Sequence, residues 1–210
     1  MKYKVMIVED QTMPRELFEL RIQASEHFEA ALSIDNAALA DVYCLRFPVD
    51  LILMDVVTRG GESGLDAAER IKRTFPQIKI IIVTSMPECS YLSRAREIGV
   101  ESFWYKEEQR ESLLDVMERT MAGESVYPDA TPELQLGLAS SYNFTDRELE
   151  VLREMTGGDT NQEIAERLHL SVASVKTHIL NMLEKTGFKN RTELAVRARE
   201  SGLVILNRKD

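Results

Sequence analysis

The sequence predicts an α/β fold, a doubly wound five-stranded parallel sheet, followed by a smaller all-α domain of four helices. Three observations lead to this prediction. Short β-rich runs alternate with helical patterns through residues 3–121. The β-rich runs are almost continuously apolar, which is typical of strands covered on both faces. After residue 142 every periodic segment is helical.

Each predicted strand is followed by a predicted helix, as a parallel sheet with crossover connections requires. The strands are expected at Tyr3–Val8, Ala30–Ile34, Leu51–Met54, Ile78–Val83 and Ser102–Tyr105. The helices are expected at Pro14–Ala24, Asn36–Phe47, Leu65–Phe75, Ser90–Ile98 and Glu107–Met121.

Residues 123–142 are rich in Pro, Gly and Ser and have weak periodicity, so we expect a linker with one short helical stretch at Glu133–Ala139. The predicted domains are therefore residues 1–122, the linker 123–142 and residues 143–210. In the last of these, two Thr-x-x-Glu motifs begin helices as capping boxes, and Ser residues and glycines mark the other boundaries. The capping boxes are Thr145–Glu148 and Thr160–Glu163, and the next helices are expected at Asn161–Leu168, Val172–Thr186 and Thr192–Glu200.

The net charge of −9 at first counts against a nucleic-acid partner. However, residues 1–142 hold 15 Lys/Arg against 24 Asp/Glu, whereas residues 143–210 hold 11 of each. Within the latter, residues 168–209 carry eight basic side chains against three acidic ones. The bulk charge therefore leaves DNA binding open for the second domain.

Two cysteines, Cys44 and Cys89, are too few for a disulfide framework or a metal cluster. The apolar run at the N-terminus is too short for a signal peptide, and no run approaches the roughly 20 apolar residues of a membrane span. We therefore expect a cytoplasmic protein without a membrane partner.

Polar side chains gather where the predicted strands end. Glu9 and Asp10 follow the first strand, Asp55 the third, Thr84 the fourth and Lys106 the fifth. Because function gathers at the carboxyl ends of strands in open parallel sheets, these groups are expected to converge. Clustered carboxylates repel one another unless a cation neutralises them, and Mg²⁺ is the hard cation that suits carboxylates and phosphate oxygens.

These groups predict a Mg²⁺-dependent phosphoryl site. Asp55 is the candidate nucleophile, because a carboxylate can attack phosphorus and form an acyl phosphate. Glu9 and Asp10 would hold the metal with it, while Lys106 and the Thr84 hydroxyl would bind the phosphoryl oxygens.

Residues 1–122 resemble the flavodoxin-like receiver domain of two-component response regulators. The resemblance implies that Asp55 accepts phosphate from a sensor histidine kinase, that Thr84 and Phe103 form the switch, and that the Val57 main-chain carbonyl is a further metal ligand. The loop after Asp55 departs from the family pattern, because it lacks a Pro and is one residue longer.

In the second domain, the helices Asn161–Leu168 and Val172–Thr186 have helix-turn-helix spacing. Val175, Ile179 and Met182 define an apolar face of the second helix, and the opposite face carries small, polar and cationic residues suited to the major groove. The candidate DNA contacts are Ser171, Ser174, Lys176, Thr177, Leu180 and Asn181, with Lys185, Lys189 and Arg191 as candidates for phosphates.

The run from Phe144 through Ala195 looks like the LuxR-type DNA-binding domain, and the two domains together resemble the NarL/FixJ family of transcription regulators. The resemblance implies that Lys176, Thr177 and Leu180 read bases, although Leu180 stands where a polar residue is common. It also implies that the last helix pairs two copies on paired half-sites, and that His169 occupies a left-handed turn position.

We therefore expect a DNA-binding transcription regulator rather than an enzyme, controlled by phosphorylation of Asp55 and active as a homodimer. Two alternatives stay open. One is a regulator that binds DNA regardless of phosphate, which the altered loop after Asp55 suggests. The other is a haloacid-dehalogenase-like phosphatase, which needs a second Asp two residues after the first, where this chain has Val57.

Overall fold

The computed structural model describes residues 2–85, 90–106 and 111–204. They divide into two compact units, one of residues 2–85 and 91–130 and the other of residues 131–204. Within this described part, no helix combines the length and the apolar character needed to cross a bilayer.

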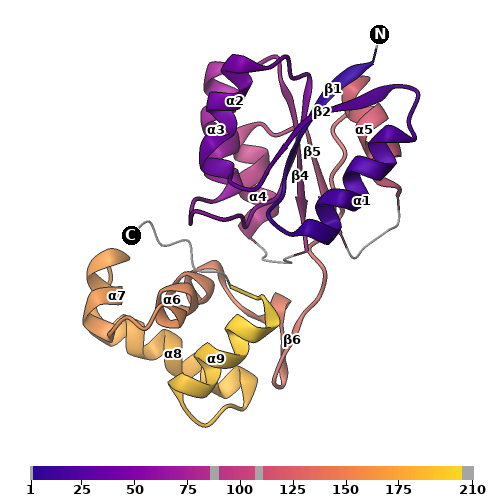
Figure 1. Ribbon diagram of the computed structural model, residues 1–210. Coiled ribbons are helices and arrows are strands. Elements are labelled where there is room, and N and C mark those ends of the chain that lie inside the picture. Colours follow the sequence, from indigo (N-terminus) through magenta and orange to yellow (C-terminus); the bar gives the residue numbers. More distant parts are fainter. Residues whose placement is uncertain (1, 86–89, 107–110, 205–210) are drawn as a thin grey trace. The chain divides into compact units, whose positions relative to one another are not determined.

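The first unit is built on a five-stranded parallel sheet (Figure 1). The spatial order is β2-β1-β3-β4-β5, and each neighbouring pair is parallel. This order confirms the predicted doubly wound sheet. The strands are β1 (Tyr3–Val8), β2 (Phe28–Ile34), β3 (Leu51–Met54), β4 (Lys79–Thr84) and β5 (Ser102–Tyr105).

Helices cover both faces of this sheet, with α1 and α5 on one side and α2, α3 and α4 on the other (Figure 1). The helices are α1 (Thr12–Gln23), α2 (Ala40–Arg46), α3 (Gly64–Thr74), α4 (Ser90–Ile98) and α5 (Leu113–Met121). The expected helix Asn36–Phe47 is divided, because Asn36 caps a short 3₁₀ turn, η1 (Ala37–Leu39), before α2 begins. The expected start of the last helix, Glu107, lies outside the described residues.

The core explains why the strands lack polar alternation. All four residues of β3 and of β5 are buried, because helices cover both of their faces. On one face Phe18 of α1 meets Trp104 of β5 edge-on, with ring centroids 6.5 Å apart. The neighbours of Trp104 along the strand, Phe103 and Tyr105, point to the opposite face.

The connecting segment differs from the expectation. The helix predicted at Glu133–Ala139 is wrong, since β6 (Gln135–Leu136) and β7 (Ala139–Ser140) form an antiparallel hairpin there. The two-residue turn needs Gly137, whose φ is +63° and whose missing Cβ would lie 2.2 Å from the Thr186 carbonyl oxygen. Residues up to 130 belong to the first unit and those from 131 to the second.

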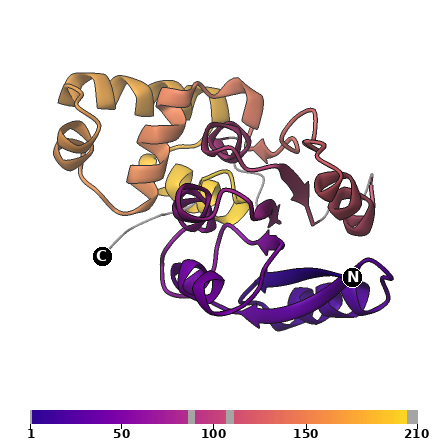
Figure 2. The same cartoon turned by 90° about the horizontal axis from the view of Figure 1, so that it is seen from above.

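Residues 131–204, the second unit, contain four α-helices. They are drawn orange to yellow (Figures 1 and 2). They are α6 (Asp146–Thr156), α7 (Asn161–Arg167), α8 (Val172–Thr186) and α9 (Arg191–Ser201), after a 3₁₀ turn, η2 (Ser141–Asn143). Both predicted capping boxes are present, at Thr145 and at Thr160. The left-handed conformation expected for His169 is also present, with φ of +53°.

Gly64 is expected to be important for the stability of the first unit. A Cβ at this first residue of α3 would lie 1.9 Å from the main-chain oxygen of Asp55, which cannot yield as a side chain could. We expect Gly64→Ala to lower the free energy of unfolding by about 3 kcal/mol, at the upper end for over-packing. Urea unfolding followed by the fluorescence of Trp104, the single tryptophan, measures this unit alone.

Gly99→Ala is the control, because Gly99 has φ of +82° and open space around it. It should cost only about 1 kcal/mol of backbone strain. An unchanged unfolding midpoint in Gly64→Ala would contradict the close approach.

Candidate functional site

The candidate site lies at the carboxyl ends of β1, β3 and β5. Parallel pairing of β1 with β3 sets Val8 beside Met54, and the Asp55 N–H donates to the Val8 carbonyl oxygen at 2.9 Å. Glu9 and Asp55, the next residues of the two strands, are thereby neighbours. Lys106 enters from β5, and its N–H donates to the Thr84 carbonyl oxygen at 2.9 Å.

Lys106 joins the two buried carboxylates. Its Nζ donates to Asp55 Oδ2 at 2.9 Å and also to Glu9 Oε2. Glu9 is 1% exposed and Asp55 5%, while Thr84 at the end of β4 is fully buried. The structure thus brings the strand-end residues of the prediction together at one edge of the sheet.

The electrostatics of this cluster are dominated by burial. Burial raises the pKa of the Asp55 carboxyl from 3.8 to about 6; the Lys106 ammonium lowers it in part, and the Glu9 carboxylate raises it further. Burial alone would lower the pKa of Lys106, but the carboxylates of Asp55 and Glu9 outweigh it and the pKa lies above its usual value. One cation therefore faces more negative charge than it can neutralise.

Three carboxylates of this site could hold a metal ion. One oxygen each from Glu9, Asp10 and Asp55 all lie within 4.8 Å of one another. Such an all-oxygen donor set suits a hard divalent cation that keeps part of its water shell, as Mg²⁺ does. The Val57 N–H lies 3.4 Å from Asp55 Oδ1, so the backbone at Val57 is beside the Asp55 carboxylate.

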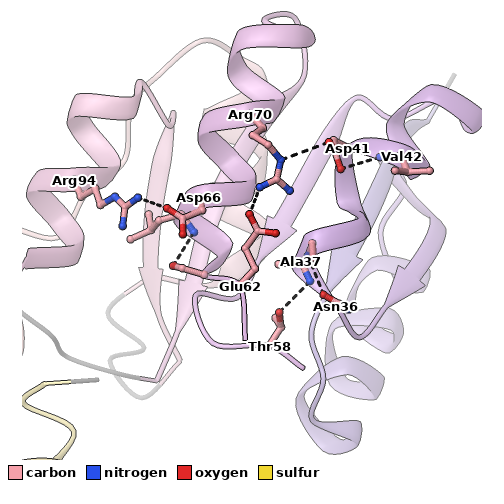
Figure 3. Close-up of polar contacts among 12 residues, drawn as sticks. Asn36, Ala37, Asp41, Val42, Thr58, Glu62, Asp66, Arg70 and Arg94 are labelled. Carbon is pink, nitrogen blue, oxygen red and sulfur yellow. Dashed lines mark hydrogen bonds and ion pairs between the residues drawn. The ribbon is translucent and has the colours of Figure 1, made fainter. Parts of the chain in front are cut away.

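The loop after Asp55, residues 56–63, is held by hydrogen bonds at several points. Val57 and Ser63 form an isolated antiparallel bridge, and the Gly64 N–H donates to the Val56 carbonyl oxygen at 2.8 Å. Thr58 Oγ1 accepts from the Ala37 N–H at 2.9 Å (Figure 3). The longer loop, which lacks the usual Pro, is therefore tied both to itself and to the segment after β2.

Ion pairs on α3 brace the same region (Figure 3). Arg70 donates to Glu62 in the loop and lies 3.5 Å from Asp41 Oδ2 of α2. Arg94 of α4 donates to Asp66 of α3. The pairs therefore link the loop and the three helices on one side of the sheet. Their side chains are only partly exposed, so water screens these pairs less than it would at the open surface.

The predicted switch residue Phe103 is 2% exposed. Its ring centroid lies 4.9 Å from that of Tyr105 and 6.3 Å from that of Tyr127. Sequence reasoning missed Tyr127, because a tyrosine in a Gly- and Pro-containing segment has no periodic signal. It also missed Arg15, whose Nη1 donates to the Glu9 carbonyl oxygen at 3.1 Å.

In the second unit, α8 presents one buried and one exposed face. Val175, Ile179 and Met182 are buried, while the side opposite exposes Lys176, Thr177, Leu180 and Asn181. Ser171 caps the helix by accepting from the Ser174 N–H at 3.0 Å, and the two hydroxyls lie 2.8 Å apart. The amphipathic pattern predicted for this helix is confirmed.

The three candidate phosphate contacts differ in their surroundings. Lys185 Nζ donates to Glu148 Oε2 at 2.6 Å and to the Asn143 carbonyl oxygen at 2.8 Å. Arg191 donates to Asn161 Oδ1 at 2.9 Å and to the Asp159 carbonyl oxygen at 2.8 Å. Lys189 is exposed. Lys185 and Arg191 thus have structural partners within the unit.

Two family descriptions match the chain. "Response regulator receiver domain" matches residues 5–118, and "Bacterial regulatory proteins, luxR family" matches residues 142–198. The first range contains the carboxylate cluster and the second contains the helix-turn-helix.

Relatives align with nearly the whole length of this chain. The response regulator protein VraR of Staphylococcus epidermidis is 31% identical over 209 residues, covering 97% of this chain and 100% of its own. VraR of Staphylococcus aureus is 31% identical over 217 residues with the same coverage. RcsB of Salmonella enterica serovar Typhimurium, solved on promoter rprA with the phosphomimetic BeF₃⁻, shares the fold with a TM-score of 0.59 at 20% identity, covering 93% of this chain and 98% of that one.

The raised pKa of Asp55 makes stability depend on pH. Because the folded pKa of about 6 exceeds the unfolded value of 3.8, the unfolded chain loses this proton first and the folded state loses stability as pH rises from about 4 to 6. We expect Asp55→Asn to match the original chain at pH 4 and to be more stable at pH 8 by about 1 to 3 kcal/mol without divalent metal. Urea unfolding at both pH values measures the difference.

Asp129→Asn, at an exposed position of the connecting segment, is the control and should change stability by less than about 0.5 kcal/mol at either pH. The same stability difference at pH 4 and pH 8 for Asp55→Asn would contradict the assignment of burial as the cause.

Lys185 is expected to contribute to the stability of the second unit whether or not a ligand is bound. Burial by itself raises the pKa of Glu148, but hydrogen bonds from Lys185 and Thr145 outweigh it, so this carboxylate stays charged at 2% exposure. Removing its partner in Lys185→Ala should lower the stability of the second unit by about 1 to 3 kcal/mol. Thermal unfolding followed by helical circular dichroism tests this, and exposed Lys189→Ala should leave the melting temperature unchanged.

Proposed function

The chain belongs to the two-component response regulators with a receiver domain and a LuxR-type DNA-binding domain, and from this membership we propose that phosphorylation of Asp55 controls its binding to DNA. Members of this family are helix-turn-helix transcription regulators and not classical enzymes. The observation that carries the proposal is the Lys106 ammonium bound to both Asp55 and Glu9 at the strand ends of a matched receiver.

The phosphoryl group would come from a phosphohistidine of a sensor histidine kinase. An Asp55 carboxylate oxygen attacks the phosphorus, the bond from phosphorus to the imidazole nitrogen breaks, and an acyl phosphate forms on Asp55. Lys106, 2.9 Å from Asp55 Oδ2, neutralises the oxygens of the transferred group, and the Thr84 hydroxyl binds one of them. Slow hydrolysis of this acyl phosphate returns the receiver to its starting state.

Glu9, Asp10 and Asp55, with the Val57 main-chain carbonyl, would hold Mg²⁺. The three carboxylate oxygens within 4.8 Å of one another fit this cation. Bound there, Mg²⁺ supplies charge that offsets both the clustered carboxylates and the incoming phosphoryl oxygens. Burial keeps the Asp55 pKa at about 6, so the carboxylate is available to metal and phosphorus above that pH.

Thr84 and Phe103 would form the switch. Phe103 follows Ser102 on β5, and its Cα partner on β4 is Ile82, two residues before Thr84. A shift of the Thr84 hydroxyl toward a phosphoryl group therefore acts on a strand that is paired with the strand of Phe103. The switch changes the populations of two receiver conformations, which is how a local charge acts at a distance.

Double-stranded DNA is the proposed ligand of the second unit. α8 would enter the major groove and present Lys176, Thr177 and Leu180 to bases, with Asn181, Ser171 and Ser174 at the margins. The exposed Lys189, together with Lys185 and Arg191, would lie toward phosphates. DNA as the ligand implies that the regulator works in the cytoplasm.

A homodimer on paired half-sites is the proposed active form. Val196 of α9 is 49% exposed and lies between Ala195 and Arg197 in the sequence. An apolar residue on the open side of this helix supports its pairing with a second copy. Linking two weak DNA-binding units raises the apparent affinity without adding a base contact to either.

The proposed division of the chain is a receiver at residues 1–122, a linker at 123–142 and the DNA-binding domain at 143–210. The chain passes from the first compact unit to the second between residues 130 and 131, inside the proposed linker. The competing function within this family is a regulator whose DNA binding ignores phosphate.

One experiment tests these points together. Bound sequences are selected from random double-stranded DNA with and without acetyl phosphate and Mg²⁺, and Asp55 labelling is followed by intact mass. We expect labelling of the original chain, none of Asp55→Asn, and tighter binding to a two-fold sequence only when the chain is labelled. Labelling of Asp55→Asn refutes the acceptor, and equal binding by labelled and unlabelled chain establishes the phosphate-independent alternative.

A further inference from the structure

Three aromatic rings connect the carboxylate site to the segment that leaves the first unit. Tyr105, directly before Lys106, is the Cα partner of Thr84 across β4 and β5. Its ring packs on Phe103 with centroids 4.9 Å apart, and Phe103 in turn packs on Tyr127 at 6.3 Å. We call Tyr105, Phe103 and Tyr127 the aromatic row. Rings at these separations attract one another beyond the effect of their buried area.

The segment that carries Tyr127 is bound along the open edge of β5. The Phe103 N–H donates to the Val126 carbonyl oxygen at 2.8 Å, and the Val126 N–H donates to Ser102 Oγ at 3.1 Å. Ser102 Oγ lies 2.7 Å from Thr120 Oγ1 of α5, and both side chains are fully buried. Val126 is therefore fixed to the same strand residues that position Phe103.

Tyr127 itself has two further attachments. Its hydroxyl donates to the Val100 carbonyl oxygen at 2.7 Å, and the Arg96 guanidinium of α4 lies 4.4 Å from its ring centroid. A cation over a ring face is attracted by the negative charge of that face, so Arg96 holds the ring of Tyr127. Burial raises the pKa of Tyr127 to about 12, although Arg96 lowers it in part, so the hydroxyl keeps its proton at neutral pH.

We propose that Tyr127 is the positioning residue through which the receiver's phosphorylation state reaches the DNA-binding unit, with Arg96 holding its ring. This inference rests on the proposed function and assigns the output side of the switch to a residue of the connecting segment. Thr84 is paired with Tyr105, and Lys106 follows Tyr105 in the chain, so a displacement of Thr84 or Lys106 would displace β5. Phe103 lies on the same strand, and its ring packs on that of Tyr127, so the displacement would be passed to Tyr127.

The backbone after Tyr127 is restricted in conformation, so a displacement of Tyr127 would be passed along the chain to the second unit. Pro128 has its own φ fixed by the ring and confines Tyr127 to extended conformations. The second unit begins at residue 131, so few free dihedral angles lie between the aromatic row and that unit. A displacement or release of Tyr127 therefore changes where the second unit is tethered.

The test measures DNA affinity of the full chain with and without acetyl phosphate in Mg²⁺, on the sequence selected for the original chain. Allosteric couplings typically amount to about 5- to 150-fold, and we expect a phosphorylation effect of at least fivefold to fall below about twofold in Tyr127→Leu. Tyr127→Phe keeps the ring and should retain most of the effect. Intact mass should show that both variants label on Asp55 like the original chain.

Tyr3→Leu is the matched control. Tyr3 is a half-exposed ring of the same unit that packs on Phe28 with centroids 5.9 Å apart, away from the aromatic row. It should retain the full phosphorylation effect. If Tyr127→Leu fails to fold, as judged by Trp104 fluorescence, then Arg96→Leu replaces it, because Arg96 is exposed and loosens the same ring.

Hydrogen exchange of the original chain provides a readout that needs no variant. Phosphorylation should change the exchange rate of the amides in residues 124–130. Unchanged exchange there in a labelled chain, or a full phosphorylation effect in labelled Tyr127→Leu, overturns this inference and leaves the proposed function intact. Absence of Asp55 labelling in the original chain removes the proposed function, and the inference with it.

Discussion

Two buried carboxylates share one lysine, and most of the first unit is arranged around that interaction. Glu9 and Asp55 are withdrawn from water, which costs several kcal/mol per ion unless other charges compensate. The Lys106 ammonium compensates one of them, and Asp10 adds a further negative charge beside the pair. The cluster is therefore left with excess negative charge, which a divalent cation or the proton on Asp55 relieves. Neutralising this charge would contribute to the free energy of binding a cation at the proposed metal site.

The sheet makes this arrangement possible because the strand ends that carry the charged residues are held rigidly by strand pairing. Val8 and Met54 pair directly, so the two acidic residues that follow them cannot drift apart without breaking the ladder. Gly64 lets the start of α3 approach the Asp55 main chain more closely than any other residue would allow. Thr58 and Arg70 then fix the intervening loop to its neighbours. The loop after Asp55 thus obtains from hydrogen bonds and an ion pair what a proline would supply through its ring.

The features that the sequence predicts correctly are those that depend on a few neighbouring residues, such as an apolar run or a capping motif. Apolar runs such as Leu51–Met54 identify buried strands, and a Thr-x-x-Glu motif such as Thr145–Glu148 identifies a helix start, because each depends on neighbours in sequence. The helix predicted at Glu133–Ala139 is wrong because Leu134, Leu136 and Leu138 alternate with a period of two, which is the period of a strand and not of a helix. Partners far apart in sequence left no signal. Tyr127 meets Phe103, and Lys185 meets Glu148, only after the fold has brought them together.

The internal use of basic side chains bears on how the second unit could bind DNA. The Lys185 ammonium is paired with the Glu148 carboxylate, which neutralises its charge in part, while the Arg191 guanidinium donates to two neutral oxygens that hold it in place. Each phosphate neutralised contributes to affinity through counterion release, and a unit with few free cations binds weakly and with a shallow salt dependence. Leu180, 56% exposed on α8, can make an apolar contact with a thymine methyl group but adds no positive charge. A single unit with these properties would rely on a second copy for useful affinity. Control of the distance or freedom between two copies is then sufficient to control binding, and a receiver need not alter the DNA-binding surface at all.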